Sequence, residues 1–149
     1  MQKILVAVDG SGQSMVAART AIDIAEKYGT ELIVLHVISP DVRYGYLEDV
    51  ITPGFPAALK EVVLLATEKG QKYLDEVKRY ASDGKVKIQT EVLIAATSVV
   101  KEIVQYAEEH KIDLVVVGTR GTSGIKKMLL GSTAWGLVTY AHCPVLVVK

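Results

Sequence analysis

Apolar residues gather in five short runs along the chain, and stretches with helical periodicity separate these runs. The runs cover Ile4 to Val8, Leu32 to Val37, Val86 to Ile94, Leu114 to Val117 and Val145 to Val148. The second, fourth and fifth are almost entirely Val, Ile and Leu, which is typical of strands buried on both faces of a sheet. The third alternates apolar and polar residues, so we expect it to be an edge or half-exposed strand.

Four stretches with apolar residues at helical spacing predict helices between and after these strands. The predicted helices cover Ser14 to Tyr28, Leu59 to Val77, Val99 to Ala107 and Ser132 to Ala141. Gly29 stands where a glycine commonly ends a helix, and Pro144 follows the last helix, as expected beyond a helix end. Gly70 is a weak point inside the second helix, because glycine lowers helix propensity.

The alternation of strands and helices predicts an α/β fold of one domain over residues 1–149. We expect a five-stranded parallel sheet with helices on both faces, a Rossmann-like nucleotide-binding sandwich with strand order 3-2-1-4-5. Ligands of such sheets bind at the carboxyl ends of the strands, where the winding reverses. The stretch from Ser39 to Pro56 reads as a long loop, and long loops are often mobile functional elements.

Composition narrows the class of protein. The 17 basic and 17 acidic residues balance and form no basic cluster, which argues against a nucleic-acid partner. The lone Cys143 cannot form an internal disulfide, and the scattered histidines do not have the spacing of zinc ligands. No stretch is long and apolar enough to cross a membrane, so we expect a soluble cytoplasmic protein.

A glycine-rich segment after the fourth strand is the strongest chemical signal. Gly118-Thr119-Arg120-Gly121 leaves the strand, and Gly131-Ser132 opens the last helix after nine intervening residues. Glycines let backbone amides approach phosphate oxygens, and a helix N-terminus adds unpaired amides and partial positive charge. Arg120, Lys126 and Lys127 would add charge, and Ser132 a hydroxyl. The segment therefore predicts a polyphosphate site; the alternative is that these glycines only form a turn and a helix cap.

The first strand-to-helix turn gives a weaker signal of a different kind. Gly10-Ser11-Gly12-Gln13-Ser14-Met15 begins like the dinucleotide fingerprint, but Met15 occupies the place of its third glycine. A nicotinamide dehydrogenase is therefore disfavoured, and a Walker A sequence is absent. Asp9, at the end of the first strand, could accept hydrogen bonds from ribose or adenine, or could cap the following helix.

The spacing Gly118-x2-Gly121-x9-Gly131-Ser132 resembles the nucleotide signature of the universal stress protein family. The segments Ile4 to Ser11 and Cys143 to Val148 resemble the family as well, so the resemblance covers nearly the whole chain. It implies binding of ATP, or of ADP or AMP, with Mg²⁺ or Mn²⁺ accompanying the phosphates. The binding residues that we carry over or expect beside them are Ala7, Asp9, Val37, Gly118, Arg120, Gly121, Gly131, Ser132 and Thr133.

The resemblance assigns Asp9 to the adenosine, the Val37 backbone to the adenine edge, and the glycines with Ser132 to the phosphates and ribose. One departure is Ala95, since many relatives have glycine after the third strand; its methyl group could narrow the site or have no effect.

Three functions remain open at this point. The first is a nucleotide-dependent regulatory or stress-response switch. The second is a slow ATPase or nucleotidyl-transfer enzyme, which is disfavoured because no Asp, Glu or His lies between Gly118 and Ser132. The third is a nucleotide-free interaction module, which the intact glycine motif disfavours. We also expect a homodimer through Val145 to Val148, because the final apolar strand would leave a sheet edge unpaired.

Overall fold

Five parallel strands form one sheet in the order β3-β2-β1-β4-β5, as expected from the sequence. The strands are β1 (Lys3–Ala7), β2 (Glu31–Ile38), β3 (Ile88–Ile94), β4 (Leu114–Gly118) and β5 (Val145–Val148). The computed structural model describes residues 1–41, 55–120 and 130–149, with the backbone alone at 55–58.

Burial along the strands follows their place in the sheet. Ile4, Leu5 and Val6 of the central strand β1 are fully buried, because helices cover both faces of the sheet. β3 lies at the edge, and its residues Gln89 and Glu91 are exposed between half-buried neighbours. The predicted half-exposed edge strand is therefore confirmed, although it begins at Ile88, which pairs with Leu32, and not at Val86.

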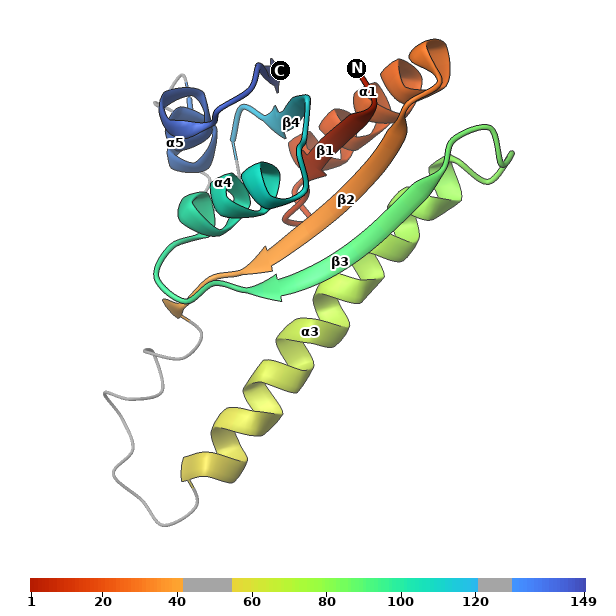
Figure 1. Ribbon diagram of the computed structural model, residues 1–149. Coiled ribbons are helices and arrows are strands. Elements are labelled where there is room, and N and C mark those ends of the chain that lie inside the picture. Colours follow the sequence, from red (N-terminus) through yellow and green to blue (C-terminus); the bar gives the residue numbers. More distant parts are fainter. Residues whose placement is uncertain (42–54, 121–129) are drawn as a thin grey trace.

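The helices are α1 (Gly12–Tyr28), α3 (Phe55–Tyr80), α4 (Val99–Glu109) and α5 (Ser132–Tyr140). Figure 1 shows the sheet with α4 and α5 on one side and α3 on the other. Side chains of α1 and α3 pack with Ile4, Val6 and Leu32 in one core cluster. Side chains of α4 and α5 pack with Leu5 and Ile33 in a second cluster. Successive residues of a strand therefore pack on opposite faces of the sheet, as a three-layer α/β fold requires.

The C-terminal end of α1 agrees with the prediction, whereas the helix begins at Gly12, two residues before the predicted Ser14. Gly29 adopts the left-handed region at φ 63°, and its amide N–H donates to the Ala25 and Glu26 carbonyls. At the start of the helix, the Ser11 hydroxyl accepts a hydrogen bond from the Ser14 amide.

The bounds predicted for this helix are wrong, because α3 extends beyond Leu59 and Val77 at both ends. The helix continues through Gly70, where the His36 ring packs closely and leaves no space for a Cβ atom. The helix also begins at Phe55, so the last two residues of the expected loop belong to it, and Pro56 lies in the first turn, where a missing N–H costs little. The rest of that loop from residue 42 lies outside the described residues. The amino-terminal half of α3 extends past the sheet, and its Leu64 and Leu65 are exposed (Figure 1).

The winding reverses between β1 and β4. From β1 the chain crosses to β2 on one side, while β4 lies on the other side and leads to β5. Adjacent strands at such a point send their following segments to opposite faces, which opens a crevice at their carboxyl ends. Among the described helices, none has the length and apolar character needed to cross a membrane.

Candidate functional site

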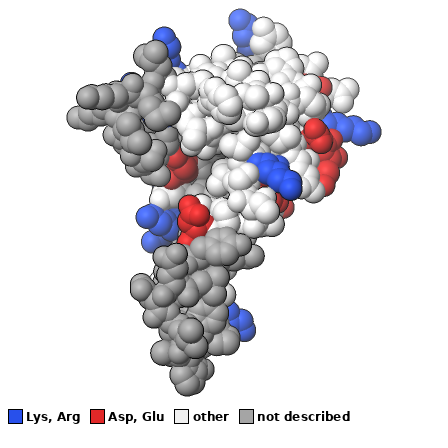
Figure 2. All heavy atoms as spheres, turned by 90° about the vertical axis from the view of Figure 1, so that its left-hand side faces the viewer, with Lys and Arg blue, Asp and Glu red and all other residues white. Residues whose placement is uncertain are grey.

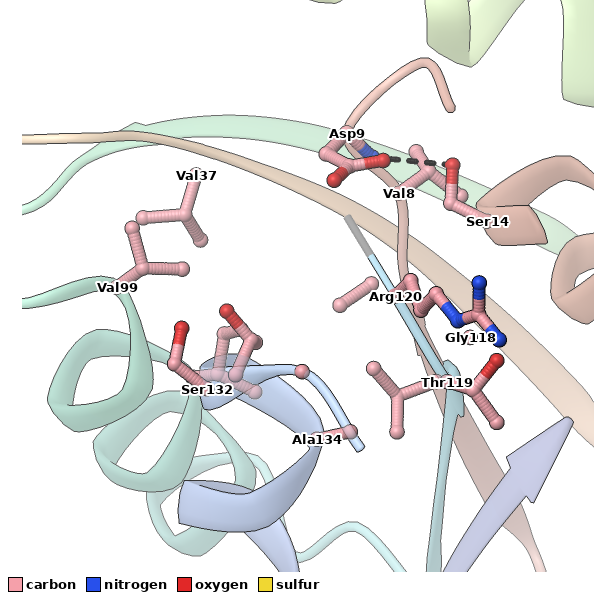
Figure 3. A pocket seen from close by; sticks show the side chains of 15 residues that line it. Val8, Asp9, Ser14, Val37, Val99, Gly118, Thr119, Arg120, Ser132 and Ala134 are labelled. Carbon is pink, nitrogen blue, oxygen red and sulfur yellow. Dashed lines mark hydrogen bonds between the residues drawn. The ribbon is translucent and has the colours of Figure 1, made fainter. Parts of the chain in front are cut away.

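A cavity opens at the carboxyl ends of β1 and β4, where the sequence analysis expects a ligand. Its walls come from the ends of β1, β2 and β4 and from the first turns of α1, α4 and α5. Figure 3 shows how several of these side chains surround it. The lining residues are Ala7, Val8, Asp9, Ser14, Val37, Val99, Ile103, Val117, Gly118, Thr119, Arg120, Gly131, Ser132, Thr133 and Ala134.

One side of the cavity is apolar. Val37 at the end of β2 and Val99 at the start of α4 lie together in Figure 3, and Ile103 and Val117 also line the cavity. Ile103 is only 1% exposed, so it is held by the packing between α4 and the sheet. Apolar walls of this kind suit a flat heteroaromatic ring, whose orientation is then set by a small number of polar groups.

Asp9 supplies a carboxylate to the cavity and also orders the turn in which it lies. The Ser11 amide donates a 2.9 Å hydrogen bond to Asp9 Oδ1, and the Asp9 amide donates to Ser14 Oγ at 3.3 Å. Ser14 is nearly fully buried, which fixes its hydroxyl against the turn (Figure 3). The two roles that the sequence suggests for Asp9, ligand contact and local capping, are therefore compatible in one conformation.

The start of α5 forms another wall of the cavity. Gly131 is the N-cap at φ −67° and ψ 160°, and it has no side chain with which to cap the helix. The first amides of a helix have no intrahelical partners, so those of α5 depend on another acceptor. Since the helix N-terminus also carries partial positive charge, this wall suits an anion. Ser132 and Thr133 bring hydroxyl groups to the same place.

Gly118 has a packing role that the sequence analysis did not anticipate. A Cβ atom at this position would lie 3.0 Å from the carbonyl carbon of Gln13, in the first turn of α1. The close contact between β4 and α1 therefore favours glycine at position 118, in addition to any phosphate contact.

The structure brings eight of the nine predicted binding residues to the cavity: Ala7, Asp9, Val37, Gly118, Arg120, Gly131, Ser132 and Thr133. Arg120 is exposed at the point where β4 ends. The ninth, Gly121, lies outside the described residues, as do Lys126 and Lys127.

Sequence reasoning missed the contribution of α4. The spacing of Val99 and Ile103 predicts only the apolar face of a helix, but both residues also line the cavity. The signal was available, since a helix that follows a parallel strand begins at the ligand edge of the sheet. Ala95 is fully buried and is not among the described residues that line the cavity, so its methyl group does not narrow it.

His36 and Cys143 are not among the described residues that line the cavity. His36 Nδ1 lies 2.8 Å from the Val8 carbonyl oxygen, and the ring faces Tyr73, not the cavity. Cys143 is half-buried, and burial raises the pKa of its thiol, which keeps the group protonated and weakly nucleophilic.

The chain is similar over its whole length to known proteins. The model of the universal stress protein family matches residues 1–149. A universal stress protein of Methanocaldococcus jannaschii is 40% identical over 152 residues, which cover 99% of this chain and 82% of that protein. The solved structure of the universal stress protein UspA from Lactobacillus plantarum matches with a TM-score of 0.85 and 25% identity, over 99% of this chain and 97% of that one. A universal stress protein solved in complex with cAMP matches with a TM-score of 0.63 and 28% identity, over 99% of this chain and 95% of that one.

Proposed function

We propose that this chain, which belongs to the universal stress protein family, binds ATP or a closely related adenine nucleotide, ADP or AMP, in the cavity between β1 and β4. One observation carries the proposal: in the described structure, a single cavity joins an apolar wall, a carboxylate and the N-terminus of α5, whose N-cap residue Gly131 makes no side-chain capping hydrogen bond. These three features match the base, the ribose and the phosphates of a nucleotide. The related protein in complex with cAMP, itself an adenine nucleotide, supports the same ligand class.

The arrangement of the walls supports one proposed orientation of the nucleotide. The adenine ring packs against Val37 and Val99, and the Val37 backbone meets its edge. Asp9 accepts hydrogen bonds from the ribose hydroxyls. The phosphates lie against Gly131 and Ser132, where the amides of α5 and its dipole favour negative charge.

Mg²⁺ or Mn²⁺ accompanies the phosphates in this proposal. Within the described parts of the chain, no cluster of three His, Cys, Asp or Glu side chains could hold a metal ion. The ion would therefore take its oxygen ligands mainly from the nucleotide and water, with hydroxyls such as that of Ser132 completing its shell.

We further propose that the bound nucleotide acts as a regulatory signal and turns over slowly. The sequence from Gly118 to Ser132 contains no Asp, Glu or His that could serve as a general base beside the phosphates. Asp9, the carboxylate that lines the described cavity, is assigned to the ribose. A slow ATPase is the alternative, and single-turnover hydrolysis of bound ATP separates the two; a rate near the enzyme median of about 10 per second would favour the enzyme.

The position of β5 at the edge of the sheet supports the proposal that the protein forms a homodimer. The Val115 amide donates to the Pro144 carbonyl and the Thr119 amide to the Val148 carbonyl, so even-numbered residues face β4. Because the pairing direction alternates along a strand, Val145 and Val147 direct their backbone groups to the outer edge. Nearby in sequence, α5 exposes Trp135, and Figure 2 shows a broad uncharged area on the side where α4 and α5 lie. Pairing of two β5 strands would satisfy this edge.

The lone Cys143 supports a cytoplasmic location, and the family match supports one domain over residues 1–149, as part of the same proposal.

Identification of co-purified nucleotide tests the proposed function. The protein is purified without added nucleotide and denatured, and the released small molecules are identified by mass. We expect adenine nucleotides from the parent protein and little from the Gly131→Val variant purified in parallel. A parent protein that releases no adenine nucleotide, and takes up none from MgATP in equilibrium dialysis, would contradict the proposal.

A further inference from the structure

Two aromatic side chains connect α3 to the turn that carries Asp9. Tyr73 lies on α3 and His36 on β2, and their rings meet edge to face with centroids 5.4 Å apart and an interplanar angle of 75°. Neither ring is among the residues that line the cavity in the described structure. Each nevertheless touches a residue adjacent to Asp9.

Tyr73 packs on the residue that follows Asp9. Gly10 adopts φ +83°, and a Cβ atom there would lie 2.3 Å from Tyr73 Cζ. The three nearest atoms are the ring carbons Cζ, Cε1 and Cε2, and the hydroxyl oxygen is not among them, so the Gly10 backbone lies over the face of the ring. Glycine is needed at position 10 both for its left-handed conformation and for this contact.

His36 holds the residue that precedes Asp9. A carbonyl oxygen only accepts, so His36 Nδ1–H donates the 2.8 Å hydrogen bond to the Val8 carbonyl. The opposite edge of the ring meets α3, since a Cβ atom at Gly70 would lie 2.4 Å from His36 Cδ2. The imidazole therefore fills the space between the end of β1 and the backbone of α3.

The residues before and after Asp9 are therefore both held by side chains that pack on or belong to α3. Val8 is held through His36, and Gly10 lies on Tyr73, while Ser11 and Ser14 of the α1 start hold Asp9 itself. Such close packing transmits a shift of α3 to the turn, because there is little free volume to absorb it.

We propose that Tyr73 and His36 are positioning residues of the nucleotide site, which act through Asp9 and couple occupancy of the site to α3. The inference rests on the proposed nucleotide binding. Thermodynamic linkage makes this coupling reciprocal. If the position of α3 raises the affinity for nucleotide, bound nucleotide restrains α3 around Gly70 and Tyr73 by the same free energy. An element that extends beyond the sheet therefore responds to the nucleotide.

A purely structural role for Tyr73 is the competing explanation, since its ring also packs against the core cluster that contains Leu74 and Val77. Matched variants separate the two roles. Tyr73→Phe retains the ring carbons that contact Gly10, and Tyr73→Leu removes them. His36→Asn retains a donor for the Val8 carbonyl, and His36→Leu removes it. Val77→Ala weakens the packing of α3 in the core at a residue that is fully buried and does not line the cavity.

Affinity for ATP is measured by calorimetry beside the melting temperature of each variant. We expect Tyr73→Leu and His36→Leu to raise the Kd about tenfold, and Tyr73→Phe and His36→Asn to stay within about twofold of the parent. Val77→Ala should lower the melting temperature and leave the Kd within about twofold. Equal Kd values for Tyr73→Leu and the parent, or an equal rise in Val77→Ala, would overturn the proposal.

A double-mutant cycle tests whether Tyr73 acts through Asp9. If it does, Tyr73→Leu should change the Kd by less than about twofold in an Asp9→Ala background. Additive losses would show that Tyr73 affects the site by another route and would overturn the assignment.

A readout without nucleotide distinguishes failure of this inference from failure of the proposed function. Over the face of Tyr73, a Gly10 Hα proton should give an upfield ring-current shift in the NMR spectrum of the nucleotide-free protein. We expect that shift in the parent and Tyr73→Phe, and its loss in Tyr73→Leu. If Tyr73→Leu loses the shift but the parent binds no nucleotide, the proposed nucleotide binding is refuted and the contact between Tyr73 and Gly10 stands. If the parent shows no ring-current shift, the contact on which the inference depends is refuted.

Discussion

The Thr119 hydroxyl donates a 2.9 Å hydrogen bond to Gln13 Oε1, which joins the end of β4 to the first turn of α1. Thr119 is nearly fully buried, and Gly118 beside it approaches the Gln13 backbone too closely for a side chain. The glycines of the nucleotide signature are therefore not equivalent. Gly118 packs closely against the start of α1, while Gly131 caps α5 in a conformation open to other residues.

Gly118→Val should destabilise the protein. The new side chain would meet the Gln13 backbone, which cannot move without displacing α1, and overpacking of this kind costs about 1–3 kcal/mol. Urea unfolding of the nucleotide-free protein measures the loss. A free energy of unfolding equal to that of the parent would show that β4 and α1 adjust without cost.

Gly131→Val should abolish nucleotide binding and leave the fold largely intact. Its φ of −67° and ψ of 160° lie in the β region, which valine adopts readily, so the backbone is not strained. The branched side chain would instead occupy the space of a phosphate, and the change of N-cap residue costs about 1 kcal/mol. Circular dichroism checks the fold and equilibrium dialysis the binding. A folded variant that binds ATP as tightly as the parent would show that the phosphates lie elsewhere.

The sequence predicts the fold well because its signals are local and repeated. Short β-branched runs such as Leu114 to Val117 favour strands that are buried on both faces, and Gly29 ends α1 as its position indicates. The candidate site was located less completely. Val99 and Ile103 reach the cavity only because the sheet places α4 beside β2, a tertiary relation that helical periodicity does not contain.

The contacts that Tyr73 and His36 make beside Asp9 could not be predicted from the sequence either. Tyr73 is 64 positions from Asp9, and its apolar spacing on a helix predicts only core packing. Gly70 lowers the helix propensity of α3, and its lack of a side chain also admits the His36 ring. Both features arise from close packing between elements, which depends on the assembled fold.

The stabilising contribution of the Asp113 carboxylate should be lost in acid. Its Oδ2 accepts hydrogen bonds from the amides of Gln2 at 2.7 Å and Lys3 at 2.9 Å, and these bonds lower the pKa of the carboxyl below its ordinary value. Since the folded pKa is below the unfolded one, the stabilisation is present above about pH 4 and is lost as pH falls through the folded pKa. Asp113→Asn should reduce the fall in melting temperature between about pH 6 and pH 3.

The matched control for this variant is Asp23→Asn, which removes one charge from the exposed face of α1. It should retain the pH dependence of the parent. Identical pH profiles for Asp113→Asn and the parent would show that this carboxylate does not contribute to acid sensitivity.

Val147→Pro should shift a homodimer toward monomer. The Val147 amide faces the outer edge of β5, so proline would remove a donor from subunit pairing without breaking the ladder to β4. Sedimentation at micromolar concentration should give about twice the 16.1 kDa chain mass for the parent and a lower value for the variant. A parent that sediments as a monomer throughout this range would contradict the dimer.

Titration of the parent protein with MgATP tests the central claim most directly. Adenine burial and several amide–phosphate hydrogen bonds should give saturable binding with a low-to-middling micromolar Kd, about −8 kcal/mol at 1 µM. Calorimetry and equilibrium dialysis are run together, because the second detects binding that releases no heat, and Gly131→Val serves as the non-binding control. Saturation by the parent alone is the predicted result; no saturable binding to the parent at millimolar MgATP would contradict the account.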